Sequence, residues 1–263
     1  MIGAIIGDVV GSRFEFNNAY NFDFELFTSE CAYTDDTICT IAIADAVLNG
    51  KEYKDALHTW CRCYPNPTGS YGCSFAGWVA SNNPRPYNSF GNGSAMRVSA
   101  IGWLFYTLEQ VEEEAMLSAM PTHNHPEGIK GAVATASAIF LARTQGKEAM
   151  LEAMKSYYPQ WREPVLGGNK FDETCQGTMP VVLGIIQKAN SFEEAIRYAI
   201  AVGGDSDTIG AIVGGIAEAI WGVPEQLQST VKSYLPDEMV HIIEQLYKKN
   251  IVDISCQNTP VPL

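Results

Sequence analysis

The stretch IGAIVGGIAEAI, residues 209–220, decides the fold class of this 263-residue chain. Its branched apolar residues recur at three- and four-residue steps, which is the period of an α-helix with one apolar face. Glycines at positions 210, 214 and 215 lie within the same stretch. Because a glycine inside a helix leaves room for a neighbour, the stretch predicts a helix that packs closely against another one.

The same helical period continues on both sides of this stretch. Apolar residues repeat at this spacing over residues 38–48 and stop at Gly50, a residue type that commonly ends helices. Pro126 opens a similar segment that ends at Gly146. Comparable signals mark helices at residues 57–60 and 96–104, after the capping box at residues 191–194, and after Pro224 and Pro236.

No window of the chain alternates apolar and polar residues between hairpin turns. We therefore predict an all-α fold of about ten or more helices. No linker or charge run divides the chain, so residues 1–263 are expected to form one domain. Residues 61–92, rich in Pro, Gly, Asn, Ser and Tyr, do not fit the helical pattern and predict a long functional loop.

Two acidic segments carry most of the functional information. They are TDDT at residues 34–37 and GGDSDT at residues 203–208, each followed by a helical run that starts at Ile38 or Ile209. Crowded carboxylates repel one another unless a cation lies between them. Carboxylates and hydroxyls without nearby Cys or His favour Mg²⁺, Mn²⁺ or Ca²⁺. The alternative is that each segment simply supplies an aspartate that caps a helix.

Composition excludes some classes of function. A net charge of −13 argues against sequence-independent binding to nucleic acid, which depends on cations that contact phosphate. The apolar runs are too short and too interrupted for a membrane span. Seven scattered cysteines, at positions 31, 39, 61, 63, 73, 175 and 256, form no metal-binding pattern and indicate reduced thiols. We therefore expect a cytoplasmic protein.

Two further segments could contact a ligand. The turn SFGNGS, residues 89–94, leads into a predicted helix, an arrangement suited to binding a phosphate, although Ser94 could equally be a helix cap. His123 and His125 precede the helix that starts at Pro126. These imidazoles could bind a metal, but hydrogen bonding to a ligand or stacking on it fits better beside an oxygen-rich metal site; the alternative is two ordinary loop histidines.

Five blocks, taken in order, resemble those of the ADP-ribosylglycohydrolases, the family that includes the dinitrogenase reductase-activating enzyme. They are GDVVGSRFE (7–15), TDDT (34–37), GNGSAMR (91–97), THNHP (122–126) and GGDSDT (203–208). The resemblance implies an all-helical fold, a compact orthogonal bundle of about ten or more helices with a metal-containing cleft for two Mg²⁺ or Mn²⁺ ions. It also implies hydrolysis of the glycosidic bond between ADP-ribose and an acceptor, with ADP-ribosylated proteins as the expected partners.

The resemblance implies a role for each matched residue. One ion would be held by Thr34, Asp35, Asp36 and Asp207. The other would be held by Asp205, Asp207 and Thr208, with Glu15 near it. The diphosphate would be bound by the turn Ser89, Phe90, Gly91, Asn92, Gly93 and Ser94, with Phe90 stacked on adenine and His123 lining the pocket.

The chain departs from the family pattern in two places. Gly72 lies in a turn, YGCS at residues 71–74, that is richer in glycine in similar members and is expected to line the pocket at the scissile ribose. Residues 171–176 match no family segment, which leaves the acceptor open.

Cleavage of a glycosidic bond needs an activated nucleophile and a proton for the leaving group. We assign acid/base catalysis, or gating of the second ion, to Glu15, with Asp36 as the alternative base and Asp8 in a structural role. A catalytically silent ADP-ribose-binding protein and a metal-dependent phosphohydrolase of a nucleotide pyrophosphate are the alternative functions. A monomer is expected.

Overall fold

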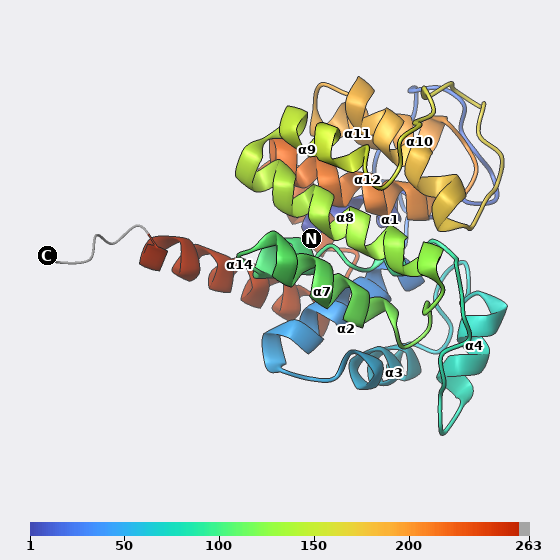
Figure 1. Ribbon diagram of the computed structural model, residues 1–263. Helices are drawn as coiled ribbons and strands as arrows, with labels where there is room; N and C mark the ends of the chain where they lie inside the picture. Colours follow the sequence, from blue (N-terminus) through green and yellow to red (C-terminus); the bar gives the residue numbers. More distant parts are fainter. Residues whose placement is uncertain (258–263) are drawn as a thin grey trace, which may run out of the picture.

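The computed structural model describes residues 1–257, and within them the chain forms α-helices joined by loops, with two isolated β-bridges and no longer strand (Figure 1). The predicted all-α fold is confirmed. In chain order the helices are α1 (Ile2–Gly11), α2 (Asp35–Asn49), α3 (Tyr53–Cys63), α4 (Cys73–Ala80), α5 (Gly93–Met96), α6 (Ile101–Leu104), α7 (Leu108–Ala119), α8 (Pro126–Gln145), α9 (Lys147–Met154), α10 (Cys175–Lys188), α11 (Phe192–Ala201), α12 (Ser206–Trp221), α13 (Glu225–Lys232) and α14 (Asp237–Gln257).

Helix α12 contains the apolar stretch that predicted the fold, and it lies in the middle of the molecule with α1 and α8 (Figure 1). Its glycines are where α1 approaches it. A Cβ at Gly210 would lie 2.5 Å from the carbonyl oxygen of Gly7, and a Cβ at Gly214 would lie 2.0 Å from that of Gly3. The two backbones touch, so the expectation that these two glycines permit close helix packing is confirmed.

Helix α1 was not predicted from the sequence. All ten of its residues, IGAIIGDVVG, are buried, so the helix has no polar face to give its apolar residues a visible period. The signal that could have revealed it is the spacing of Gly3, Gly7 and Gly11, which places one glycine on each successive turn of a single helix face. That face is the one that meets α12.

Most helix ends lie where the sequence places them. Gly50 ends α2 in the left-handed conformation, with φ 61°, and Gly146 follows the last residue of α8. Ser191 caps α11 by accepting a hydrogen bond from the backbone of Glu194. The predicted reciprocal bond goes elsewhere, because the carboxylate of Glu194 accepts from the backbone N–H of Asn190 instead.

Two expectations about loops and helices are wrong. Residues 61–92 are not one continuous loop, because α3 extends to Cys63 and α4 occupies residues 73–80, burying Phe75, Trp78 and Val79. The single helix expected over residues 96–104 is two short ones, α5 and α6, separated by four residues. These small helices lie around the central helices and carry no regular apolar stripe that the sequence could reveal.

Six cysteine side chains, at positions 31, 39, 61, 63, 73 and 175, are free thiols in the described part of the chain. Cys256 lies outside the residues whose side chains are described. None of the helices within the described residues is long and apolar enough to cross a membrane.

Candidate metal and ligand site

The two acidic segments meet where α2 and α12 begin. Thr34 is the N-cap of α2, and Asp205 occupies the corresponding position before α12. The hydroxyl of Thr208 lies 3.3 Å from Asp36 Oδ2, although 172 residues separate the two along the chain. The prediction that both segments are loop ends leading into helices is confirmed. The alternative of an aspartate cap fits neither segment, because Thr34 caps α2 and the Asp205 side chain makes no capping hydrogen bond.

Five carboxylates form two clusters that share Asp207. Asp8 and Asp36 make one cluster with Asp207, and Glu15 and Asp205 make the other, with one oxygen from each residue of a cluster lying within 4.8 Å of the others. Asp207 is therefore placed to bridge two cations. Asp35 is the first residue of α2 and belongs to neither cluster.

Asp8 organises the turn that carries the first cluster. Its carboxylate accepts hydrogen bonds from the backbone N–H groups of Thr34 and Thr37, at 3.0 and 3.1 Å, and from both threonine hydroxyls. The Thr34 hydroxyl also accepts from the backbone of Asp36 at 3.1 Å, so the structure gives it a capping role. Asp8 lies within a buried apolar helix. Because burial of a carboxylate is costly without hydrogen-bond partners, a lone carboxylate in such a run indicates a specific structural role.

The clusters carry more negative charge than the fold alone neutralises. Burial raises the pKa of Asp36 and of Asp207 well above its usual range. Burial, with added repulsion from Asp8, raises the pKa of Asp35 to about 8. In the described part of the chain, no lysine, arginine or histidine forms an ion pair with any of these carboxylates.

One oxygen in the first cluster has no partner. Asp36 Oδ1 is fully buried and makes no hydrogen bond within the described residues. A buried carboxylate oxygen without a partner is costly unless a proton or a cation lies beside it. Because the donors are all hard oxygens, the site fits divalent cations such as Mg²⁺ or Mn²⁺.

Glu15 is half-buried at the second cluster. Burial, followed by repulsion from Asp205, raises its pKa to about 7. Gly69, with φ 78°, lies against it, and a Cβ there would be 2.7 Å from Glu15 Oε2. On the other side of the cluster, Asn92 Nδ2 donates to Asp205 Oδ2 at 2.7 Å. Asn92 was expected in the diphosphate turn, and its amide instead fixes a carboxylate.

A cavity of about 490 Å³ opens beside the clusters. The structure brings most of the predicted site residues to its wall: Glu15, Asp35, Asp36, Gly72, Ser89, Gly91, Asn92, Gly93, His123, Asp205, Asp207 and Thr208. Sequence reasoning missed other lining residues, among them Phe16, Ser70 and Glu173, which lie in or beside stretches without a strong motif, and Arg97, the last residue of the block at 91–97.

Three predicted residues lie off the cavity wall. Thr34 is buried beneath the turn, and Ser94 is buried with its hydroxyl donating to the carbonyl of Gly128 at 2.7 Å. Phe90 is 45% exposed and leans on His125, with ring centroids 5.3 Å apart. The helix after the turn, α5, has only four residues, so it offers a phosphate a much smaller dipole than the predicted longer helix would.

His123 is held in a defined orientation at the cavity wall. Arg97, which is fully buried, donates to Thr122 Oγ1 at 2.8 Å, and that hydroxyl lies 2.7 Å from His123 Nδ1. A hydroxyl that accepts from an arginine has its own hydrogen available for the imidazole, which favours the tautomer with the proton on Nε2. Burial, reinforced by Arg97, lowers the pKa of His123 well below its usual range. The ring therefore presents a neutral N–H donor on the side of Gly91 and Gly93.

The chain is similar to known proteins over almost all of its length. The profile of the family described as ADP-ribosylglycohydrolase matches residues 1–254. ADP-ribosylhydrolase ARH3 from Homo sapiens is 25% identical over 338 residues, covering 95% of this chain and 93% of that protein. ADP-ribosylarginine hydrolase Tri1 from Pseudomonas putida (strain GB-1) is 24% identical, covering 85% and 70%. A solved structure titled ADP-ribosylglycohydrolase-related protein complex shares the fold, with a TM-score of 0.70, 22% identity and coverage of 95% and 97%.

Proposed function

Because the chain belongs to the ADP-ribosylglycohydrolase family, we propose that it hydrolyses the glycosidic bond between ADP-ribose and an acceptor, using two divalent cations. The observation that supports the use of two cations is the pair of carboxylate clusters joined at Asp207. The cavity beside them has the size expected of a small-ligand pocket. An ADP-ribosylated protein side chain is the acceptor we favour.

Each cation would have its own set of oxygen donors. The first would be held by Asp36 and Asp207 with Asp35 beside them, the whole turn being fixed by Asp8. The second would be held by Asp205 and Asp207, with Glu15 and Thr208 beside them. When bound, such ions supply positive charge that orients the ribose hydroxyls and activates a water molecule.

Glu15 is the residue that we propose moves the proton. A carboxyl group whose pKa is about 7 is present in both protonation states near neutral pH, so it can donate a proton to the leaving group and later accept one from water. Asp36 is the alternative base. It is a weaker candidate because Thr208 already donates a hydrogen bond to its Oδ2.

The remaining wall of the cavity would bind ADP-ribose. A Cβ at Gly91 would lie 3.5 Å from His123 Nε2, and a Cβ at Gly93 would lie 3.3 Å from it. Glycine at both positions therefore leaves this space to a ligand. We propose that the His123 N–H donates to the diphosphate or the ribose there. Phe90, which is exposed beside this turn, would stack on the adenine.

The test is product analysis with purified protein and conjugates of ADP-ribose linked to arginine, to serine and to nucleic acid. Release of free ADP-ribose that requires Mg²⁺ or Mn²⁺ and stops on addition of EDTA is the expected result. Full activity in metal-free, chelated protein would overturn the use of cations. AMP together with ribose phosphate would indicate a phosphohydrolase, and tight binding of ADP-ribose without turnover would indicate a silent binding protein.

A further inference from the structure

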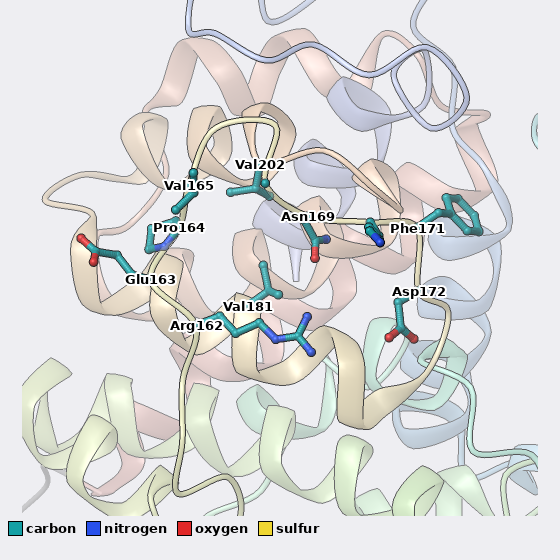
Figure 2. Close-up of a pocket in the computed structure, with 11 residues that line it drawn as sticks. Arg162, Glu163, Pro164, Val165, Asn169, Phe171, Asp172, Val181 and Val202 are labelled. Carbon is teal, nitrogen blue, oxygen red and sulfur yellow. The ribbon is translucent and has the colours of Figure 1, made fainter.

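A second cavity, also about 490 Å³, lies between the loop that joins α9 to α10 and the residues Val181 and Val202 (Figure 2). Its wall is anchored to the fold through the backbone. The Arg162 N–H donates to the carbonyl of Pro180 at 2.9 Å, and the Asn169 N–H donates to that of Val202 at 3.0 Å. The side chains of this loop are therefore presented from a fixed backbone.

Two positively charged side chains of this cavity have no partner in the described part of the chain. Arg162 and Lys170 line it, and the side chain of neither has a hydrogen bond or ion pair within the described residues. Each of the two lining carboxylates has a partner, which is charged for Glu163 and neutral for Asp172. Glu163 lies 3.7 Å from the amine of Lys188, and Asp172 accepts from the backbone and the hydroxyl of Thr174. Two unpaired cations on a chain of net charge −13 form a local attraction for an anion.

Exposed apolar side chains lie on this loop and on the segment that contacts it. Phe171 lines the second cavity and is 47% exposed, while Phe16 lines the catalytic cavity and is 76% exposed. Their rings are stacked, with centroids 6.3 Å apart. Val165 and Tyr20 are also exposed, and a Cβ at Gly167 would lie 3.1 Å from the Tyr20 ring, so the segments 16–20 and 165–171 are in contact.

We name the surface formed by Phe16, Tyr20, Arg162, Val165, Lys170 and Phe171 the rim surface. Exposed apolar groups gathered in one place mark a site of interaction with another molecule. The stacked pair places this surface at the mouth of the catalytic cavity. A molecule bound there would extend outward from the mouth of that cavity.

We infer that the rim surface binds the polypeptide of an ADP-ribosylated protein, at a segment that carries carboxylate side chains beside the modified residue. This inference rests on the proposed function. Carboxylates of the segment would lie against Arg162 and Lys170, and its apolar side chains against Phe16 and Phe171. A nucleic acid fits less well, because two cations cannot offset the repulsion between a long polyanion and a chain of net charge −13.

The test compares two ADP-ribosylated peptides that share one linkage, one with Asp and Glu beside the modified residue and one with Asn and Gln. At low salt we expect kcat/KM for the acidic peptide to be about 3- to 20-fold higher, the range for two exposed ion pairs, and the difference to shrink in high salt. The double variant Arg162→Glu/Lys170→Glu should remove or reverse this preference. It should leave cleavage of the corresponding ADP-ribosylated free amino acid within about twofold of the wild type.

The matched control is Lys54→Glu/Lys248→Glu, which changes the net charge by the same amount. These lysines are on α3 and α14, two helices that lie on the opposite side of the central helices (Figure 1), and neither lysine forms an ion pair within the described residues. This control should keep the wild-type preference. Melting temperatures of both double variants within about 3 °C of the wild type would show that each is folded.

Each remaining outcome contradicts one idea in particular. Equal kcat/KM for the two peptides, or an equal effect of both double variants, overturns the rim surface while leaving the proposed function intact. If Arg162→Glu/Lys170→Glu lost as much activity on an ADP-ribosylated oligonucleotide as on the acidic peptide, the assignment to a polypeptide would be wrong. If the protein releases ADP-ribose from none of the conjugates, the proposed function is wrong. Binding of an acidic segment to the rim surface is then tested by fluorescence anisotropy with the two unmodified peptides. Equal affinities for the two peptides would overturn it.

Discussion

Glu15 occupies a different environment from the other carboxylates of the site. It is half-buried and lines the cavity, and its pKa is about 7, whereas Asp8 is fully buried and uses its oxygens for four hydrogen bonds. A residue that transfers protons must reach the reacting atoms and must exist in both protonation states. The remaining acids of the two clusters are better suited to holding cations.

Replacement of Glu15 by Gln tests this assignment. We expect kcat to fall about 10²-fold or more, the effect typical of losing a general acid or base, because the amide keeps the shape but cannot transfer the proton. Affinity for ADP-ribose, measured by calorimetry, should stay within a fewfold of the wild type. A variant with the kcat of the wild type would move the role to Asp36 or to the water itself.

Phe90 tests where adenine binds. If the ring stacks on the base, Phe90→Ala should weaken ADP-ribose binding by about 10- to 100-fold, since a stacked base contributes about 1–3 kcal/mol. The melting temperature should change little, because the ring is 45% exposed. Leu117→Ala, which removes a side chain that is 43% exposed on α7, is the control and should change neither quantity.

The opposite pattern would be equally informative. Normal nucleotide affinity together with a much lower melting temperature would show that Phe90 stabilises the fold through His125. Adenine would then have to be sought along the cavity wall, where Tyr71 and Tyr87 are the next aromatic residues.

At the scale of helices, the contact between α1 and α12 positions the shared carboxylate. A Cβ at Gly11 would lie 2.5 Å from the Cα of Asp207, so the end of α1 lies directly against the start of α12. Asp8, three residues earlier on α1, holds the turn before α2. Helix α1 therefore sets the relative position of both acidic segments. A change in its packing should weaken metal binding at the site.

Gly7→Ala should be strongly destabilising. The new methyl would lie 1.8 Å from the carbonyl oxygen of Gly210, so the two helices must separate. We expect a loss of more than about 3 kcal/mol, or roughly 6–12 °C in melting temperature, together with weaker Mn²⁺ binding. Gly77→Ala is the control, because that glycine lies in α4 with no neighbour within 4 Å. It should leave the protein as stable or up to about 1 kcal/mol more stable.

A Gly7→Ala variant with the same melting temperature as the wild type would contradict this account of the helix contact. If the melting temperature fell while Mn²⁺ affinity stayed unchanged, the contact would stabilise the fold without positioning the site. Measuring both quantities on both variants separates these outcomes.

Sequence reasoning succeeded for helices that have both an apolar stripe and a recognisable end. The beginning of α8 at Pro126 and the end of α2 at Gly50 are examples. It failed for α1, because a helix that is buried on every side has no polar face to reveal its period. It failed for α4 because a short helix within a stretch rich in Gly, Pro and Asn is held by its contacts with the rest of the protein.

The same limit applies to the candidate site. Motifs indicated which residues gather at the cavity, because crowded carboxylates require a chemical explanation. They could not indicate that Asn92 would hold Asp205, or that Ser94 would face Gly128. Such pairings join positions more than thirty residues apart along the chain, so they follow from the way the helices pack.

At the scale of the whole molecule, folding brings together charges that are far apart in the unfolded chain. Asp8, Asp36 and Asp207 come from three different helices and meet only in the native state. Their repulsion is therefore a cost of folding that is absent from the unfolded chain. Protons or cations can remove this cost, so the stability of the protein should depend on both pH and divalent metal.

The direction of the pH effect follows from the raised pKa values. The carboxyl groups of Glu15 and Asp35 have pKa values of about 7 and about 8 in the fold, against ordinary values of 4.5 and 3.8. The native state therefore holds these protons more tightly than the unfolded chain does. Their contribution to stability is fully present below the ordinary values and is lost as pH rises through the values in the fold.

We therefore expect the melting temperature of metal-free protein to fall as the pH is raised from about 5 to about 8. Added Mn²⁺ should raise the melting temperature more at pH 8 than at pH 5, because metal and protons compete for the same oxygens. Scanning calorimetry in chelator and in excess Mn²⁺ measures both effects. The double variant Glu15→Gln/Asp35→Asn should show a shallower pH dependence, whereas Asp55→Asn, at an exposed position on α3, should keep that of the wild type. A metal-free melting temperature that is constant or rises over this range would show that the buried carboxylates are neutralised within the fold itself, and the need for cations would then lose its physical basis.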